Sequence, residues 1–136
     1  MIVVDTNVIH DCWVRGQHTA LAQAVRGHDP DWHVPLLWRS AMRNVLTAYL
    51  RRGLLSRAAI SEILRVADRA LADREHMVAD DLVLDVVANT PLTAYDAEFV
   101  ALATVLGAPL VTADKAVLKA CPRQALTMQA FVELAQ

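Results

Sequence analysis

Three aspartates, each beside a strand end or a helix start that the sequence pattern predicts, are the side chains most able to act together chemically. Asp5 ends the apolar run Met1–Val4, and Asp114 follows the apolar run Pro109–Val111. Asp96 stands at the front of a helical pattern. Carboxylates that meet repel one another, so they need a cation. Oxygen ligands with little His or Cys select Mg²⁺ or Mn²⁺, and such a site suits metal-assisted attack of water on a phosphate.

The elements that would position these acids are short apolar strands alternating with helical patterns, which predict an α/β fold with a parallel sheet. We expect strands at Ile2–Val4, Trp32–Val34, His76–Val78, Pro109–Thr112 and Leu126–Met128. We expect helices at Val8–Val14, Thr19–Arg26, Leu36–Arg52, from Ser56 to Asp73, Asp80–Asn89, Thr93–Leu106, Lys115–Ala120 and Ala130–Ala135. Ligands of open α/β sheets bind outside the carboxyl ends of the strands, which is where Asp5 and Asp114 would lie.

The two longest helices are predicted to form a hairpin. Gly53 separates them, and Ser56 is suited to cap the second helix. Apolar residues recur at helical spacing in both helices. In the first they are Trp38, Met42, Val45, Leu46, Tyr49 and Leu50; in the second they are Ile60, Ile63, Leu64, Ala67 and Leu71.

Composition is typical of a single folded domain spanning residues 1–136. Hydrophobic residues make up 55% of the chain and the mean hydropathy is +0.30, so we expect a packed core. No apolar run approaches the roughly 18 residues that a membrane span needs, and Met1–Asp5 lacks the basic start of a signal peptide. Two cysteines, Cys12 and Cys121, do not make a disulfide framework. A cytoplasmic location is therefore expected.

Charge is unevenly distributed along the chain. Residues 39–74 hold eight basic and three acidic residues, a net charge of +5, and this leaves −7 for the rest of a chain whose total is −2. Arginine contacts phosphate well, so nucleic acid is one candidate partner for this basic segment. The candidate residues for binding nucleic acid are Arg39, Arg43, Arg51 and Arg52. The alternative is a pair of solvated helices with local ion pairs, for example Asp68 with Arg65.

Each aspartate also has a purely structural interpretation. Asp5 and Asp114 could each cap the helix that follows, and Asp96 stands at a capping-box spacing from Thr93. Two of the acids, however, end strands that should be neighbours, and the third opens the helix that leads into the second of those strands. We therefore favour one shared metal site over three separate caps.

Three segments of the chain also resemble the signatures of a known family, the PIN domain. They are Met1–Ile9, Thr93–Ala103 and Leu110–Asp114, and they occur in the family's order. The length and spacing are similar to those of VapC-type toxins of bacterial toxin–antitoxin pairs. Any one of these segments is weakly specific, but the set of three is fairly specific.

The resemblance implies a three-layer α/β/α sandwich with a short, mostly parallel sheet and a protruding helical hairpin. It implies a Mg²⁺- or Mn²⁺-dependent endoribonuclease that is inhibited by a small VapB-like antitoxin and forms a homodimer. Asp5, Asp96 and Asp114 match the catalytic, metal-binding acids of the family. Thr6 and Thr112 match polar positions that support the site.

The chain departs from the family pattern at Ala41. The pattern has a Glu three residues before an Asn-Val-Leu-like step, which here is Asn44–Leu46. On a helical projection residue 41 flanks the apolar stripe, where a Glu could reach toward the sheet edge. We therefore expect weak or no activity from this chain. Two explanations stay open: a natural member of low activity, or a variant engineered to be inactive, which we favour because the other acids are kept.

Other functions find less support in the sequence. Asp5-Thr6-Asn7 has Asn where an aspartyl-phosphate phosphatase has its second acid, and His10 with Cys12 has no second ligand pair for zinc. Glu98 is expected to be solvated, because it faces away from Asp96. The main alternative is a non-catalytic PIN-like module that binds antitoxin or RNA. The sequence identifies neither the RNA target nor the number of metal ions.

Overall fold

Five short strands form one parallel sheet in the order β3-β2-β1-β4-β5 in the computed structural model, which describes residues 1–136. The strands are β1 Ile2–Val4, β2 Trp32–Pro35, β3 Glu75–His76, β4 Leu110–Val111 and β5 Ala125–Leu126. Every neighbouring pair is parallel, and Val4 of β1 pairs with Val111 of β4. The chain moves outward from β1 in one direction through β2 and β3, and in the other direction through β4 and β5. The sheet therefore has its topological switch point between β1 and β4.

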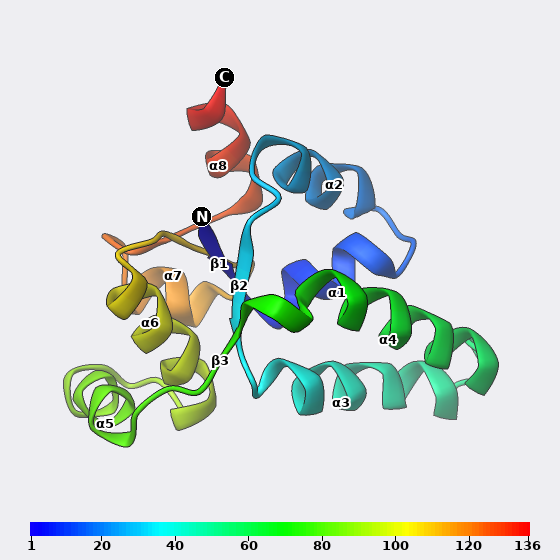
Figure 1. The fold of residues 1–136 in the computed structure, drawn as a ribbon, viewed down its shortest axis with the longest axis horizontal. Helices are drawn as coiled ribbons and strands as arrows, with labels where there is room; N and C mark the ends of the chain where they lie inside the picture. Colours follow the sequence, from blue (N-terminus) through cyan, green and yellow to red (C-terminus); the bar gives the residue numbers. More distant parts are fainter.

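Eight α-helices cover the two faces of the sheet (Figure 1). One side carries α1 (Thr6–Trp13), α2 (Thr19–His28), α3 (Trp38–Arg51) and α4 (Arg57–Leu71); the other carries α5 (Asp80–Asn89), α6 (Ala94–Leu106) and α7 (Lys115–Ala120). A short 3₁₀ helix, η1 (Ala72–Arg74), leads into β3, and the last helix, α8 (Met128–Ala135), packs against α2. The predicted three-layer α/β/α architecture is confirmed, and the sheet is wholly parallel.

Burial explains why the central strands are continuous apolar runs. Ile2, Val3 and Val4 are all buried, as are both residues of β4. A parallel strand covered by helices on both faces has no solvated side, so it carries no alternation of polar and apolar residues. These strands belong to a single core of 28 buried residues, to which α6 contributes Phe99, Val100, Leu102 and Ala103.

Several predicted boundaries were wrong by one or two residues, and capping explains most of these differences. Helix α1 begins at Thr6 rather than Val8, because the Asp5 carboxylate accepts the Thr6 amide at 2.7 Å. The last strand ends at Leu126, since Thr127 caps α8. The β3 strand is Glu75–His76, not His76–Val78, and the side chain after it, Met77, is 87% exposed.

The predicted hairpin is present as α3 and α4, which lie side by side and extend away from the sheet (Figure 1). Ser56 caps α4 by accepting the Ala59 amide. Trp38, Met42 and Leu46 bury the inner stripe of α3, but Leu50 near its outer end is exposed. The apolar stripe is therefore buried only where the hairpin meets the rest of the fold.

The predicted ion pair between Asp68 and Arg65 was wrong. Arg65 binds Glu62 within α4, and Asp68 binds Arg39 of α3. Arg39 also makes two hydrogen bonds to Glu75, of 2.6 and 2.8 Å, and the Trp38 indole donates to the same carboxylate at 2.8 Å. Glu75 is the first residue of β3, so these contacts connect both hairpin helices to the sheet edge.

Helix α5 was predicted correctly in its bounds. Leu82 is exposed, Val83 and Val86 are half-buried, and α5 contains no fully buried residue. The helix packs chiefly against α6. No helix of the structure combines the length and the apolar character that crossing a membrane would require.

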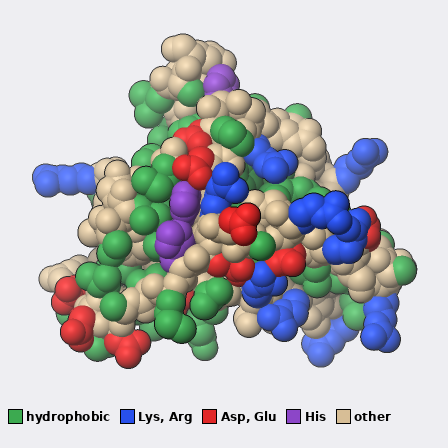
Figure 2. Space-filling model, viewed as in Figure 1, with side chains coloured by type: hydrophobic (Ala, Val, Ile, Leu, Met, Phe, Trp, Pro, Cys, Tyr) green, Lys and Arg blue, Asp and Glu red, His purple; other side chains and the backbone are tan.

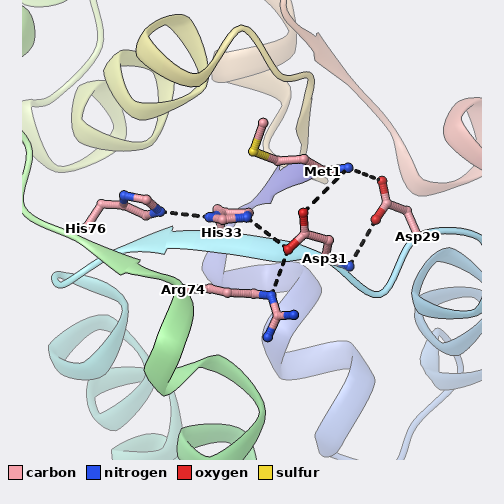
Figure 3. Close-up of polar contacts among 6 residues, drawn as sticks. All are labelled: Met1, Asp29, Asp31, His33, Arg74 and His76. Atoms are coloured by element: carbon pink, nitrogen blue, oxygen red, sulfur yellow. Dashed lines mark hydrogen bonds and ion pairs between the residues drawn. The ribbon is translucent and has the colours of Figure 1, made fainter.

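A polar network extends along the edge of β2 and β3 (Figure 3). His33 Nδ1 and His76 Nε2 are 2.7 Å apart, and His33 Nε2 lies 3.0 Å from the Asp31 carboxylate. Asp31 also accepts from Arg74 at 2.7 Å. Because ionised Asp31 can only accept, neutral His33 donates from Nε2 and accepts the proton of His76 Nε2 at Nδ1. The network thus connects the two strands through side chains as well as through the backbone.

Candidate active site

A cavity of about 660 Å³ opens at the carboxyl ends of β1 and β4, beside the switch point of the sheet. This is where open α/β sheets bind ligands. Its walls come from the β1–α1 turn, the first turns of α3, the start of α6 and the residue that precedes α7. The lining residues are Asp5, Thr6, Asn7, His10, Leu37, Ser40, Ala41, Asn44, Val45, Tyr95, Asp96, Phe99 and Asp114.

Asp5 is buried at the base of this cavity. One of its carboxylate oxygens accepts the Thr6 amide at 2.7 Å, and the other accepts the Thr112 hydroxyl at 2.7 Å. Burial raises the pKa of Asp5, and the nearby Asp96 and Asp114 carboxylates raise it further, whereas these two hydrogen bonds lower it. Asp5 thus serves as helix cap and cavity residue at once, which the sequence had presented as alternatives.

Thr112 is completely buried behind the cavity and connects two of the acids. Its hydroxyl donates to Asp5 and accepts the backbone amide of Asp114 at 3.0 Å. Asp114 in turn caps α7, accepting the Ala116 amide at 2.8 Å. The Asn7 side chain accepts the Ala113 amide at 3.0 Å, so the β1–α1 turn and the turn after β4 are bound to each other.

Asp96 approaches the cavity from the opposite side, in the first turn of α6. Its backbone amide donates to the Thr93 hydroxyl at 3.1 Å, which is the cap predicted for this helix. Partial burial raises the pKa of Asp96, and the Asp114 charge raises it further. The structure therefore brings Asp5, Asp96 and Asp114 to one cavity, where their charges act on one another.

The remaining predicted site residues divide into two groups. Thr6 and Ala41 line the cavity, so a longer side chain at position 41 would share this cavity with the aspartates. The four arginines proposed to bind RNA do not line it: they are Arg39, Arg43, Arg51 and Arg52. Glu98 is half-buried rather than solvated, and burial raises its pKa against the opposing effect of a backbone hydrogen bond from Leu37.

The donor chemistry of the cavity fits a hard divalent cation. Its acidic groups are three carboxylates, and its other polar groups are hydroxyl and amide groups together with the single imidazole of His10. No three or more His, Cys, Asp or Glu side chains are gathered closely enough to enclose a metal ion by themselves. Mg²⁺ commonly keeps several water ligands and needs only one or two carboxylates, so the arrangement suits partly water-mediated binding.

Sequence reasoning missed several residues of the cavity wall. Ser40 and Asn44 are four residues apart on α3, as are Thr6 and His10 on α1, so each pair shares one helix face. That spacing was the available signal, because Thr6 was already a site candidate. Tyr95 gave no such signal: it is exposed at the rim, beside Asp96.

Comparison with known proteins shows the family to which this chain belongs. The sequence pattern described as "PIN domain" matches residues 2–121. Among solved structures, the crystal structure of PAE2754 from Pyrobaculum aerophilum superposes with a TM-score of 0.78 at 22% identity, covering 98% of this chain and 95% of that one. No curated protein gives a significant match. At this identity the structural similarity supports the fold alone, but the family pattern covers most of the chain. On that basis, the chain belongs to the PIN domain family.

Proposed function

We propose that this protein is a metal-dependent endoribonuclease of the VapC type, the toxin of a toxin–antitoxin pair. PIN domains are generally nucleases that act on RNA, often with divalent metals. The observation that carries the proposal is the convergence of Asp5, Asp96 and Asp114 on one cavity at the switch point of the sheet. Such a site is chemically suited to a cation and a phosphodiester.

Asp5, Asp96 and Asp114 would hold Mg²⁺ or Mn²⁺ through direct and water-mediated contacts. When bound, the metal supplies an activated water and neutralises charge that develops on the scissile phosphate. Thr112 orients Asp5 through its hydroxyl, and the Thr6 amide fixes the second oxygen of the same carboxylate. Asp96 is less buried and stands on a separate helix, so it provides the opposite wall of the site.

Ala41 leaves a gap in this arrangement. It lines the cavity on α3, close to Leu37 and Asn44, but its methyl group offers no ligand. A site with one carboxylate fewer binds a divalent cation less tightly, because ligand charge sets much of the affinity. We therefore expect weak or no cleavage from the chain as it stands.

The hairpin provides the basic surface for the RNA backbone in this proposal. Figure 2 shows Lys and Arg side chains gathered over the side of the molecule where α3 and α4 lie. Arg51 lies seven residues beyond Asn44, two turns along the same helix face. Arg43 is exposed on the flank of that face. Arg39 is engaged by Glu75 and Asp68, so we assign RNA contact to Arg43, Arg51 and Arg52 instead.

The proposal includes a cytoplasmic setting, a homodimer and an antitoxin partner. We expect a VapB-like antitoxin to cover the α3–α4 hairpin and approach the cavity, where a basic side chain would offset the three acids. A complex in which the antitoxin touches neither region would contradict this part of the proposal.

The deciding experiment compares this chain with Ala41→Glu in an RNA cleavage assay containing Mg²⁺, Mn²⁺ or a chelator. Ala41→Gln is the matched control, because it has the same shape without the charge. We expect metal-dependent cleavage from the Glu variant alone. Equal cleavage by the unmodified chain would refute the idea that the missing acid limits activity.

A second candidate function is a non-catalytic module that binds antitoxin or RNA, and Ala41 is the observation that favours it. If neither the unmodified chain nor Ala41→Glu cleaves any of a varied set of structured RNAs, this candidate gains support. The antitoxin complex would then be the next object of study.

A further inference from the structure

Three hydrogen-bonded side chains extend into the wall of the cavity: Asp11, His10 and Tyr49. They are separate from the three aspartates proposed to bind metal. His10 of α1 lies between Asp11 and Tyr49: its Nδ1 is 3.0 Å from the Asp11 carboxylate, and its Nε2 is 2.8 Å from the Tyr49 hydroxyl. The His10 and Tyr49 rings are tilted by 36° with their centroids 5.5 Å apart. His10 itself lines the cavity, and Tyr49 lies one helical turn beyond the lining residue Val45. Two helices thus hold one imidazole at the site.

The partners determine what this imidazole can do. Ionised Asp11 only accepts hydrogen bonds, so the proton of neutral His10 is on Nδ1 and Nε2 accepts from the Tyr49 hydroxyl. If His10 takes up a proton, Nε2 becomes a donor and Tyr49 can accept from it without any movement of the rings. The Tyr49 hydroxyl proton is then free to point toward a ligand. The Asp11 carboxylate, which is largely buried beside the ring, accepts the Nδ1 proton in both states.

The charges around the cavity indicate what a protonated His10 could bind. None of the residues that line the cavity is Lys or Arg, and three of them are aspartates. His10 is consequently the only lining side chain that can carry a positive charge. A phosphodiester that enters an acidic cavity needs a cationic partner besides any metal, since phosphate and carboxylate repel each other.

We infer that His10, oriented by Asp11 and Tyr49, binds an RNA phosphate inside the cavity through its positive charge and through the Tyr49 hydroxyl proton that this charge releases, since both of its ring nitrogens are engaged by the two neighbours. This inference rests on the proposed function for its substrate class. Its contribution is to positioning: one phosphate is bound beside His10 on the wall formed by α1 and α3, in the same cavity as the three aspartates. The imidazole takes no part in forming or breaking bonds.

The test measures binding of a fluorescently labelled single-stranded RNA at pH 6, in the range where histidine side chains take up protons, over a series of salt concentrations. His10→Gln should weaken binding about tenfold and lower the slope of log K against log salt by about one phosphate contact. His10→Lys, which restores a charge, should recover the slope. His28→Gln is the matched control: it removes a histidine that is exposed at the end of α2, away from the cavity, and it should change neither quantity.

The outcomes separate the inference from the function on which it rests. If Ala41→Glu cleaves RNA but His10→Gln keeps the affinity and salt slope of its parent, the inference is wrong and the proposed function stands. If His10 controls binding and no variant cleaves, the nuclease proposal fails and the phosphate site stands. If the parent binds no RNA at all, both are overturned. Should His10→Gln fail to fold, Tyr49→Phe decides: unchanged affinity in that variant would refute the inference.

Discussion

Among individual side chains, Thr112 makes several of the contacts that hold the site together. It is completely buried, and its single hydroxyl donates to Asp5, accepts from the Asp114 amide and lies 3.4 Å from the Asn7 side-chain nitrogen. A carboxylate as buried as Asp5 needs such a donor, because most of it is shielded from water. Thr112 therefore determines where two of the acids stand, although it does not line the cavity itself.

Thr112→Val keeps the shape of this side chain and removes its hydroxyl. Asp5 would lose its buried donor, so we expect the free energy of unfolding to fall by about 1–3 kcal/mol and the pKa of Asp5 to rise further above its usual range. Thr112→Ser keeps the hydroxyl and should lose only about 1 kcal/mol, for one methyl group. Urea denaturation of the two variants measures the difference. A Val variant as stable as the parent would contradict the assigned role.

Asp96→Asn should separate stability from function. Burial and the Asp114 charge raise the pKa of Asp96, so the folded protein holds this proton more tightly than the unfolded chain does. The stability linked to that proton is lost as pH rises above the usual value of 3.8. At neutral pH the charged Asp96 is therefore unfavourable in the metal-free protein, and the Asn variant should melt a few degrees higher.

Asp96 should favour metal binding, although its charge destabilises the metal-free protein. The parent, and Ala41→Glu more strongly, should gain melting temperature when Mn²⁺ or Mg²⁺ is added, because a ligand that binds only the folded state stabilises it. Asp96→Asn should lose this gain and lose cleavage in the Ala41→Glu background. Differential scanning calorimetry with and without chelator measures the gain in melting temperature, and the RNA cleavage assay measures the loss of activity. An undiminished metal response in Asp96→Asn would remove Asp96 from the ligand set.

Among the secondary-structure elements, the hairpin is joined to the sheet edge by a cluster of polar contacts centred on Arg39. Arg39 binds Glu75 of β3 and Asp68 of α4, and its guanidinium also lies over the Trp38 ring, 5.4 Å from the centroid. The Glu75 carboxylate is largely buried, and its ion pair with Arg39 holds its pKa below its usual range. Removal of the arginine would leave that charge with only the Trp38 indole as a donor.

We expect Arg39→Ala to lower the free energy of unfolding by about 1–3 kcal/mol. This is less than the cost of breaking a fully buried pair, since Arg39 is partly exposed to solvent. Arg65→Ala is the control: it breaks the exposed Arg65–Glu62 pair within α4 and should cost at most about 1 kcal/mol. Guanidinium denaturation compares them. RNA affinity should fall more in Arg43→Ala than in Arg39→Ala if Arg39 is structural.

For the molecule as a whole, the His33–His76 contact links stability to pH (Figure 3). Burial, and then the charge of His33, lower the pKa of His76 below 6.5. The folded protein therefore favours neutral His76, and the stability from this preference is present above pH 6.5 and is lost as pH falls below it. Because one ring must accept from the other, protonation of both rings breaks this side-chain hydrogen bond, whereas the backbone pairing of β2 with β3 remains.

His76→Gln should flatten the dependence of unfolding free energy on pH between about pH 5 and 6.5, the interval below the usual histidine pKa. His18→Gln, which removes an exposed histidine, should leave the curve of the parent unchanged. The difference between the curves isolates His76 from the aspartates, which contribute equally to both. Parallel curves for the parent and His76→Gln would show that the pair has no such effect.

Local patterns in the sequence were sufficient to predict most helices and strands and to place the three aspartates beside strand ends or a helix start. Asp5, Ser56 and Thr93 were predicted as helix starts, and each caps a helix through its own side chain. Capping acts within about three residues, so it can be inferred from sequence. Strands of two residues are different: β3 and β5 were placed one residue too late, because so short a strand is defined by its hydrogen bonds to a neighbouring strand.

The sequence by itself determined the α/β architecture, the strand ends that carry Asp5 and Asp114, and the absence of an acid at Ala41. Burial and capping are local consequences of residue type, so these features need no knowledge of distant contacts. Only the tertiary structure decided that His10 meets Tyr49, 39 residues away, and that Arg39 pairs with Glu75 rather than facing solvent. The rotation and packing of whole helices select such partners, and single residues do not encode them.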